Sequence, residues 1–396
     1  MADTRQIYSI LNSINSQANT GASLVETAAD FISYGETVSQ LSETGKETWF
    51  AALMDRIGQT IMDNRAYQAK TVTPLWKTPF EYGSILQKIH AGNMTATQDK
   101  AWADPENVST DPMSPVVHPV EQRLYGKQAV WQIKDTIPDV QLTTAFTSAE
   151  RMAAFLSNLM LTTQNSIERS MENLANLTRS ALMAKTYLAG GAKVVKLVTA
   201  YNTAMNYSSS DAGYITPGSE SALYNRDFLR FASLQIALKL DQMQHMSSIF
   251  AKSGYERFTD RAYLSFSVLG MFDDAVSSYL AADTYHSKIV ELPEENKYIA
   301  PFWQATGSAY AFSNASKINV MLHPAGADPS TDPKIALEKA GIIALINDTE
   351  AAGLTLDERR VRTIYNPELE CTNYFHKARE RWYVDDTQNA VVFTIE

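Results

Sequence analysis

The sequence is poor in the residues and segments that most directly reveal a protein's chemistry or location. It contains one cysteine, Cys371, in 396 residues. A single cysteine excludes an intrachain disulfide and a metal site built from several thiolates. No apolar run approaches the roughly 20 residues needed to cross a bilayer, and residues 1–13 lack the basic region and apolar core of a signal peptide. We therefore expect synthesis and residence in a cytoplasm, without a membrane partner.

Recognisable catalytic motifs are also missing. There is no phosphate-binding loop, no GxGxxG, no GxSxG and no HExxH or HxxxH pair. Cys371 could act as a nucleophile only with a partner such as His376, but the flanking pattern is typical of a strand, so a small core or edge residue is the simpler interpretation. We predict no enzyme, no catalytic, cofactor-binding or metal-binding residues, and no cofactor. The six histidines are scattered: His90, His118, His245, His286, His323 and His376.

Acidic residues outnumber basic ones, and the formal net charge is -10. Such a net charge argues against a protein whose main function is to bind nucleic acid tightly. It is compatible with a protein that lies near nucleic acid without binding it strongly. Three acidic pairs could bind a divalent cation or share a proton, but caps, turns and solvated faces explain them more simply. For the first pair we expect a helix cap, because a helical pattern follows it directly. The pairs are Asp273-Asp274, Glu294-Glu295 and Asp385-Asp386.

Basic residues cluster only modestly. The second of two clusters alternates along a predicted strand, so its three charges share one face. Charge on an edge strand protects the edge from unwanted pairing, and this is the simpler interpretation. Contact with an acidic neighbour or with nucleic acid is the alternative. The clusters are Arg359, Arg360 and Arg362, and Lys377, Arg379 and Arg381.

A strand that runs through Ile137-Pro138 leads into the longest predicted helix, residues 148–185. Thr147 and Glu150 fit a capping box at its start, and Gly190-Gly191 ends it. At 1.5 Å per residue the helix would be roughly 55 Å long. The junction contains no glycine, cysteine or histidine. We therefore interpret it as a stiff joint that fixes the angle between the hairpin and the long helix. We hypothesise that this angle helps to set the curvature of an assembly.

The remaining pattern alternates between helical and extended segments. Residues 17–45 are typical of an arm that packs on something else, without a core of its own. Residues 91–126 contain four prolines and few periodic apolar residues. They lie between strand candidates 81–89 and 129–137, which predicts a long two-stranded excursion with an irregular tip. Further helices are expected at 5–16, 47–57, 222–250 and 273–282. Further extended segments are expected at 61–72, 192–202, 261–269, 308–314, 318–322, 370–386 and 390–396.

This α+β order of elements resembles the major capsid proteins of tailed bacteriophages, which have the Hong Kong 97-type fold. Several phrases are similar to segments of the major head proteins of small phi29-type podoviruses: ALMDRIG, EYGSILQKI, WQIKDTIPDVQLTTAFTS and QNAVVF. The resemblance implies an N-arm at 1–45, an N-terminal part of the peripheral (P) domain at 46–78, an extended E-loop hairpin at 79–130, the P domain with its spine helix at 131–190, an inserted axial (A) domain at 191–345, and C-terminal P-domain strands at 346–396.

The resemblance implies a structural subunit that self-assembles, as pentamers and hexamers, into the icosahedral or prolate head shell around packaged double-stranded DNA. It also implies the virion as the location, assembly in the host bacterial cytoplasm, a portal protein, decoration proteins in some members, and DNA on the inner face without sequence-specific binding. Helical and arm-like sequence begins at once, so we expect a separate scaffolding protein. Some members cross-link lysine to asparagine, for which Lys88, Lys100 or Lys127 with Asn389 are candidates.

Three alternatives stay open at this point. An encapsulin-like nanocompartment shares the fold, although the long 91–126 segment weighs against it. An enzyme could assemble a site from distant residues such as Asp273, Asp274 and His286. Another virion or surface-layer protein would polymerise without closing into shells.

Overall fold

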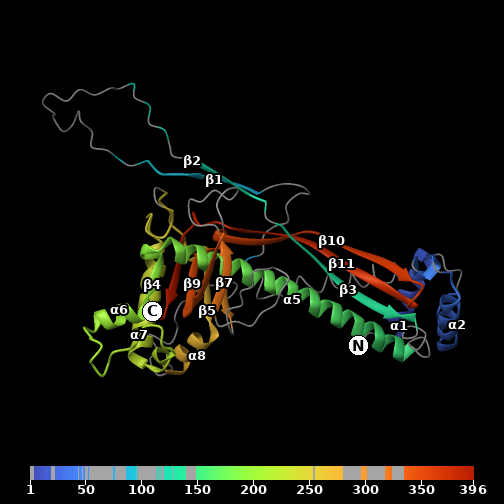
Figure 1. Cartoon of the computed structure of the whole chain (residues 1–396). Helices are drawn as coiled ribbons and strands as arrows, with labels where there is room; N and C mark the ends of the chain where they lie inside the picture. The colour runs from blue at the N-terminus through green and yellow to red at the C-terminus, as the bar shows by residue number, and fades with distance from the viewer. Residues whose placement is uncertain are drawn as a thin grey trace. The chain divides into compact units, whose positions relative to one another are not determined.

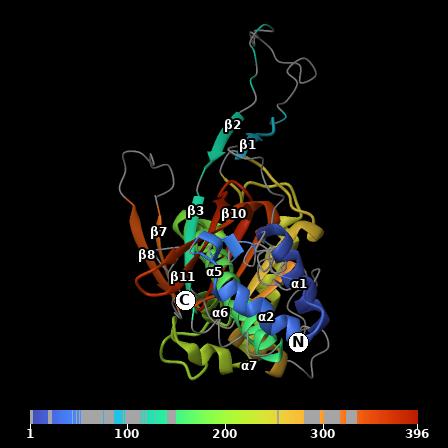
Figure 2. The ribbon, with the colours of Figure 1, turned by 90° about the vertical axis from the view of Figure 1, so that its right-hand side faces the viewer.

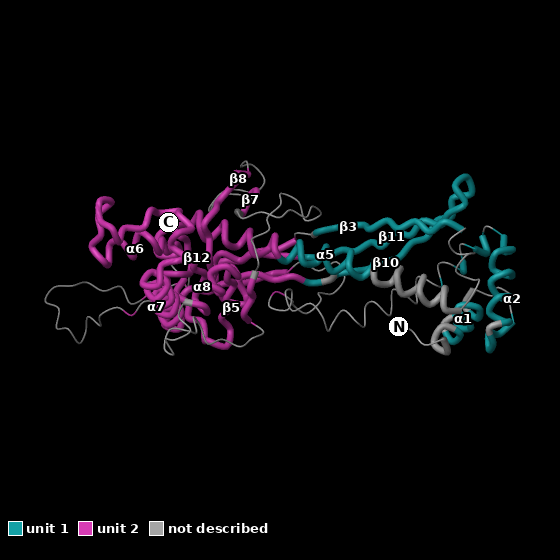
Figure 3. The backbone as a smooth tube through the Cα atoms, turned by 90° about the horizontal axis from the view of Figure 1, so that it is seen from below, with its two compact units in different colours: residues 1–73, 128–175, 355–381 teal, residues 74–127, 176–354, 382–396 magenta. Residues whose placement is uncertain are grey.

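A computed structural model covers the whole chain (Figure 1). The chain forms two compact units, each assembled from separated stretches of sequence (Figure 3). Unit 1 comprises residues 1–73, 128–175 and 355–381, and unit 2 comprises residues 74–127, 176–354 and 382–396. The structure describes residues 4–18, 23–42, 44–46, 48–49, 52, 75, 86–94, 96, 113, 115, 117, 120–126, 128–139, 149–252, 255–279, 296–300, 317–322 and 334–396.

Two helices near the N-terminus of unit 1 share a small core. They are α1 (Thr4–Ala18) and α2 (Ala28–Ser39). The hydroxyl of Tyr34, on α2, donates to the carbonyl of Leu11, on α1, at 3.5 Å. The indole Nε1 of Trp49 donates to the same hydroxyl at 2.7 Å, and all three side chains are buried. A helix in residues 17–45 was not expected, so the prediction of an arm without a core is wrong for this stretch.

The start of α2 explains why it forms. Thr27 is the N-cap residue, and its hydroxyl accepts from the backbone N–H of Asp30 while the Asp30 carboxylate accepts from the backbone N–H of Thr27. This reciprocal capping box satisfies two amide groups that a helix leaves unpaired. Phe31 and Val38 then place apolar side chains on the buried side of the helix.

Unit 1 also contains most of a three-stranded antiparallel sheet and the first part of a long helix, up to residue 175. The sheet order is β10-β11-β3, and Cys371 opposite Pro138 sets the register of β11 with β3. Alternate side chains of β11 are buried from Thr372 to Glu380, and Arg359 of β10 reaches the sulfur of Met171 on the helix at 3.1 Å. One sheet face is therefore covered and the other is open. The elements are β3 (Gln128–Pro138), α5 (Ala149–Ala189), β10 (Ala352–Asn366) and β11 (Cys371–Val384).

The predicted long helix is confirmed as α5, whose 41 residues correspond to about 60 Å. Gly190 and Gly191, with φ values of 64° and 62°, follow its last residue as predicted. These left-handed conformations cost glycine little and any other residue more. The predicted cap residue Thr147 lies outside the described residues, and so do residues 140–148 of the joint.

Unit 2 is built on a five-stranded mixed sheet in the order β4-β12-β9-β5-β6. Helices pack on it, and the fully buried rings of Phe228, Phe266, Phe272 and Phe393 join helices to strands in one apolar core. The strands are β4 (Val194–Lys196), β5 (Leu264–Leu269), β6 (Lys297–Ala300), β9 (Ile342–Asp348) and β12 (Ala390–Thr394). The helices are α6 (Leu197–Ala204), α7 (Arg226–Met243) and α8 (Gly270–Tyr279), with short 3₁₀ turns at Gly191–Lys193, Glu220–Tyr224, Arg261–Tyr263 and Thr349–Ala351.

Two further strand pairs belong to unit 2. Strands β7 (Lys317–Leu322) and β8 (Ile335–Ala340) pair with each other as a separate hairpin (Figure 2). Strands β1 (Leu86–Ala91) and β2 (Val120–Tyr125) pair antiparallel and flank the long segment between them.

Several details differ from the predictions. The hairpin was expected to pair 81–89 with 129–137, but β1 pairs with β2, and β3 pairs with β11. The expected strand at 192–202 is a strand only over Val194–Lys196 and then becomes α6. The helix at 222–250 is shorter, and α8 begins before Asp273. The segments 61–72 and 308–314, and most of 47–57, lie outside the described residues.

Candidate functional site at the base of the hairpin

The hairpin of β1 and β2 has two faces of opposite character. Ile89, Val120 and Leu124 point outward and are each more than three-fifths exposed. The other face carries charged and polar side chains from both strands, which contact the C-terminal turn and neighbouring loops of unit 2. We call this set the hairpin-base network. It consists of Lys88, His90, Glu121, Arg123, Tyr125, Lys252, Arg257, Glu350, Tyr383, Asp385, Asp386 and Thr387.

Asp385 lies at the centre of the network and its side chain is fully buried. One carboxylate oxygen, Oδ1, accepts from the hydroxyl of Thr387 at 2.6 Å and from its backbone N–H at 3.1 Å. The other, Oδ2, lies 3.3 Å from Nε2 of His90 and 3.6 Å from Nζ of Lys88. Burial alone would raise the pKa of Asp385, but the bonds from Thr387 and the charge of Lys88 hold it below its usual value.

His90 is held neutral between cations and this carboxylate. Burial, together with the charges of Arg257 and Lys88, lowers its pKa, against the opposing effect of Asp385. The guanidinium of Arg257 donates to Nδ1 at 2.7 Å, so the ring proton is assigned to Nε2, facing Asp385 and Thr387. A neutral imidazole that accepts on one side and donates on the other links three separate segments of the chain.

A second group of charges fixes strand β2. Arg123 contacts Asp386 through Nη1 and Glu121 through Nε, the latter at 2.8 Å. Lys252 also contacts Glu121. Burial alone would lower the pKa of Arg123, but Asp386 and Glu121 raise it above its usual range. Adjacent acidic and basic side chains therefore keep one another charged.

Aromatic rings close the network on one side. The rings of Tyr125 and Tyr383 lie 5.5 Å apart, and Nζ of Lys88 sits 4.5 Å above the Tyr383 ring while it donates to the carbonyl of Glu350 at 2.7 Å. A Cβ atom at Gly353 would come within 2.3 Å of the Tyr383 ring. Glycine is required there because the ring occupies the space of a side chain.

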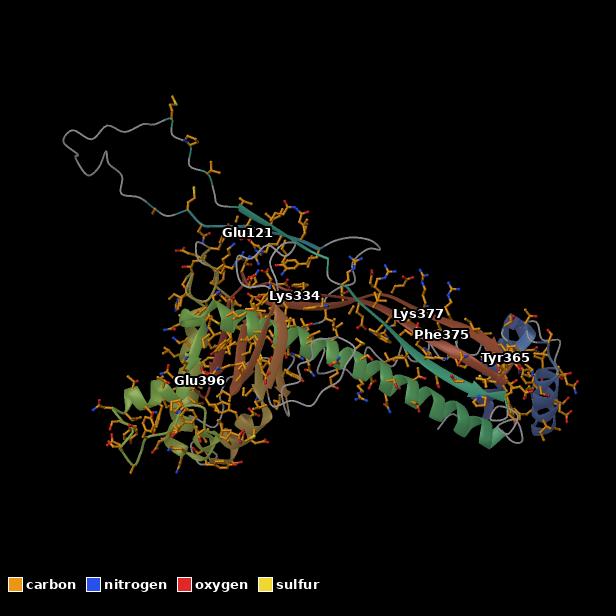
Figure 4. The ribbon with its side chains drawn as sticks, in the orientation of Figure 1. Glu121, Lys334, Tyr365, Phe375, Lys377 and Glu396 are labelled. Carbon is orange, nitrogen blue, oxygen red and sulfur yellow. The ribbon has the colours of Figure 1, made fainter. Side chains whose placement is uncertain are left out.

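This arrangement can hold a hairpin in place. Both strands are tied at their base to residues of the C-terminal turn and of the loop that contains Lys252 and Arg257. Figure 4 labels Glu121 at the hairpin, among other side chains of unit 2. The geometry is that of an anchor for a projecting element.

A separate buried charge lies in unit 1. Glu380 of β11 is fully buried, and its carboxylate accepts from Nε1 of Trp131 at 3.1 Å and from Nη2 of Arg359 at 3.4 Å. Burial raises the pKa of Glu380 and lowers that of Arg359 to about 10, so each depends on the other to stay charged.

Comparison of the sequence with models of known protein families identifies the family of this chain. The model of the Phi29-like phage major capsid protein family matches residues 7–394. The chain belongs to this family. The predicted resemblance is therefore confirmed, and the order of elements, with its hairpin, long helix and inserted α/β sheet, agrees with the predicted α+β capsid fold.

Individual relatives are more distant. The major capsid protein of Bacillus phage GA-1 is 27% identical over 164 residues, which are 41% of this chain and 33% of that protein. The match thus spans about a third of the length of that curated relative. Among solved structures, a chain of the Staphylococcus phage Andhra capsid has a TM-score of 0.49 at 12% identity, covering 82% of this chain and 83% of that one. A chain from the head fibre and inner core structure of bacteriophage P68 has a TM-score of 0.48 at 12% identity, covering 81% and 83%.

Among the described residues that were weighed as parts of a catalytic site, Cys371 and His376 are not brought together. Cys371 and His376 lie on the same strand five residues apart, so their side chains point to opposite faces. Asp273 lies in the first turn of α8, where the helix dipole favours a carboxylate, and pairs with Lys297 at 3.1 Å. It is therefore not the predicted cap. His286 lies outside the described residues, as do His118, His323 and Glu294-Glu295.

The basic cluster on β11 has acidic partners on β10. Arg381 and Arg379 lie 3.2 and 3.7 Å from Asp357, and Arg379 also donates to Glu358 at 2.9 Å. Strand β11 is central in its sheet, so the edge-strand interpretation is wrong and the acidic neighbour lies within the sheet itself.

Among the cross-link candidates, Lys88 is engaged in the network, and Asn389 is buried and donates to Thr259 at 3.1 Å. Lys100 and Lys127 lie outside the described residues. Within the part of the chain that the structure describes, no helix is both long and apolar enough to cross a membrane, and no group of three or more potential ligands is placed to hold a metal ion.

Proposed function

We propose that this chain is the building subunit of the head shell of a tailed double-stranded DNA bacteriophage. It would assemble in the host bacterial cytoplasm and reside in the capsid of the virion. Membership of the Phi29-like major capsid protein family across residues 7–394 carries this proposal. The role is structural rather than catalytic, which accords with a hairpin-base network that anchors side chains instead of presenting them to a substrate.

The anchored hairpin supports self-assembly. The side chains on its inward face are already paired within the hairpin-base network. Ile89, Val120 and Leu124 are exposed on its outward face. Exposed apolar side chains on a projecting element are typical of a surface that another protein covers. A neighbouring subunit is the partner that a shell supplies, and repeated contacts of this kind add up through multivalency.

We assign the parts of the shell subunit accordingly. The E-loop at 79–130 contains β1 and β2, the P domain at 131–190 and 346–396 contains the spine helix α5, and the A domain at 191–345 contains most of the five-stranded sheet. Strand β12, from the 346–396 segment, pairs with β9 and β4 of that sheet. Residues 1–45 would form the N-arm and 46–78 the first part of the P domain. Further partners would be a scaffolding protein, a portal protein, a decoration protein and the packaged DNA.

The composition of purified virions tests this function. In DNA-filled particles, this chain should be the dominant band on a denaturing gel, with hundreds of copies per genome. Its absence, or its presence in a few copies per particle, would contradict a shell role. A ladder of multiples on the same gel would reveal covalent cross-linking between subunits, and intact mass would reveal proteolytic processing.

A further inference from the structure

The hairpin of β1 and β2 is attached to the rest of unit 2 mainly through titratable side chains. Alternation along the two strands places six residues on the inward face: Leu86, Lys88, His90, Glu121, Arg123 and Tyr125. Leucine is the one aliphatic residue among them. The charged groups contact the C-terminal turn and the loop that contains Lys252 and Arg257. The strength of this attachment therefore depends on which groups are ionised.

His90 is the member of this set that changes charge closest to neutral pH. The ordinary pKa of histidine is 6.5, whereas carboxylates, tyrosines, lysines and arginines titrate well above or below it. Its buried ring contacts two other segments of the chain. Nδ1 accepts from the guanidinium of Arg257 at 2.7 Å, and Nε2 lies 3.2 Å from the hydroxyl of Thr387 and 3.3 Å from Oδ2 of Asp385. A change in the charge of this ring affects both contacts at once.

Protonation of the ring turns one of these contacts from attraction to repulsion. Because Nε2 already carries a proton, the added proton must go to Nδ1. Nδ1 can then no longer accept from Arg257, so the hydrogen bond is lost. Two positively charged groups would face each other at the present separation of 2.7 Å. The hairpin must move away from the loop to relieve this contact.

The other charges around the ring do not remove the conflict. Burial lowers the pKa of His90, and three neighbouring cations act in the same direction, against the opposing effect of Asp385. The cations are Lys88, Arg123 and Arg257. Glu121 lies opposite His90 in the β1–β2 register. Its carboxylate and the other two of the network are engaged by cations: Glu121 by Arg123 and Lys252, Asp386 by Arg123, and Glu350 by Lys88.

We propose that the ring of His90 is a pH-sensitive switch whose protonation releases the β1–β2 hairpin from its base in mild acid. The stabilisation is complete above pH 6.5 and is lost as the pH falls through the lower pKa that His90 has in the folded chain. Loss of the Asp385 charge follows only below its ordinary pKa of 3.8, so the two steps are separate. The apolar core of the five-stranded sheet does not titrate and stays folded through the first step.

Hydrogen exchange of residues 86–91 and 120–125 in the unassembled full-length chain, compared at pH 7 and pH 5, tests the switch. Labelling times are scaled to the intrinsic exchange rate at each pH. The opening equilibrium of the hairpin base should rise several-fold at pH 5. It can rise at most about 30-fold, the limit for a group of ordinary pKa 6.5 that binds no proton in the closed state. The buried strand β12 should keep its protection.

Substitutions assign the effect to His90. Glutamine in His90→Gln keeps one acceptor and one donor but does not titrate, so the rise between pH 7 and pH 5 should disappear. His245→Gln, at an exposed histidine of the same unit, is the matched control and should behave as the parent does. Equal protection of the parent hairpin at both pH values, or a parent-like rise in His90→Gln, would overturn the proposal.

A second variant decides the case if His90→Gln is already unprotected at pH 7. Arg257→Gln keeps an N–H donor for Nδ1 but removes the opposing charge, so its rise at pH 5 should be clearly smaller than that of the parent. A rise as large as the parent's would then overturn the proposal. The inference goes beyond the proposed shell function, and these measurements use no assembled particle, so the failure of either one is distinguishable from the failure of the other.

Discussion

Replacing Lys88 by methionine tests whether the hairpin-base network holds β1 in place. Methionine keeps most of the length and apolar volume of the lysine stem but removes the ammonium group. That group lies 3.6 Å from the buried carboxylate of Asp385 and 4.5 Å above the ring of Tyr383, and it donates to the carbonyl of Glu350. The substitution therefore leaves a fully buried carboxylate without its lysine partner.

The structure sets the size of the effect. Breaking a buried ion pair from one side costs about 3–5 kcal/mol. Asp385 keeps its two hydrogen bonds from Thr387 and its approach to His90, so we expect the lower part of that range or slightly less, about 2–3 kcal/mol. A loss of this size corresponds to a roughly 30- to 150-fold increase in the opening equilibrium of the hairpin base.

Hydrogen exchange of the amides in residues 86–91, measured by mass spectrometry on the unassembled chain, gives this equilibrium directly. The matched control is Lys196→Met, because Lys196 is half-exposed and its pair with Glu396 is worth about 0–1 kcal/mol. Since the folded-state pKa of Asp385 is lowered, the stabilisation is present above its ordinary value of 3.8 and disappears as the pH falls through the folded-state pKa. Equal protection of β1 in the parent and in Lys88→Met at pH 7 would show that the Lys88 ammonium group does not hold β1 in place.

Three further substitutions test other parts of the structure. Gly353→Ala should lower the free energy of unfolding by about 1–3 kcal/mol, measured in urea, because its Cβ meets the ring of Tyr383. Arg359→Met should cost about 3–5 kcal/mol by leaving Glu380 buried and unpaired, and the double variant with Glu380→Gln should recover most of that loss in the same urea titration. Thr27→Ala should cost about 1 kcal/mol and increase hydrogen exchange in α2, because the capping box is lost.

Each of these substitutions has its own check. Gly126→Ala is the matched control for Gly353, since no atom lies within 4 Å of the added Cβ, and it should leave the urea midpoint unchanged. If Arg359→Met and the double variant were equally unstable, the buried pair would not be the cause. If Thr27→Ala left exchange in α2 unaltered, tertiary packing around Phe31 would be sufficient to hold the helix.

The elements that could be predicted from the sequence are those with strong local signals. Helix α5 has a long helical repeat and a double glycine at its end, and β11 and β12 have clear strand patterns. Strand β2 was missed because its apolar residues Val120 and Leu124 face outward while Glu121 and Arg123 face the network, which inverts the usual hydrophobic pattern. Strand β4 is only three residues long and α6 follows it directly, so residues 192–202 show neither a clear strand pattern nor a clear helix pattern.

The hairpin-base network could not be predicted, because its members come from residues as far apart as Lys88 and Asp386. Asp385-Asp386 was correctly placed near a turn, but burial and pairing with β1 and β2 depend on tertiary structure. The only local signal was the Asp-x-Thr spacing of Asp385 and Thr387, which favours a side-chain hydrogen bond within a turn. The alternating charges on β11 could be recognised in the sequence, but their acidic partners on β10, Asp357 and Glu358, depend on the sheet order.

Sedimentation of the purified native chain, with negative-stain microscopy of the same fractions, tests whether the chain assembles into a head shell. We expect closed shells tens of nanometres across, formed by the chain alone or after addition of a scaffolding protein. A stable dimer or tetramer that ignores both protein concentration and scaffold would contradict it.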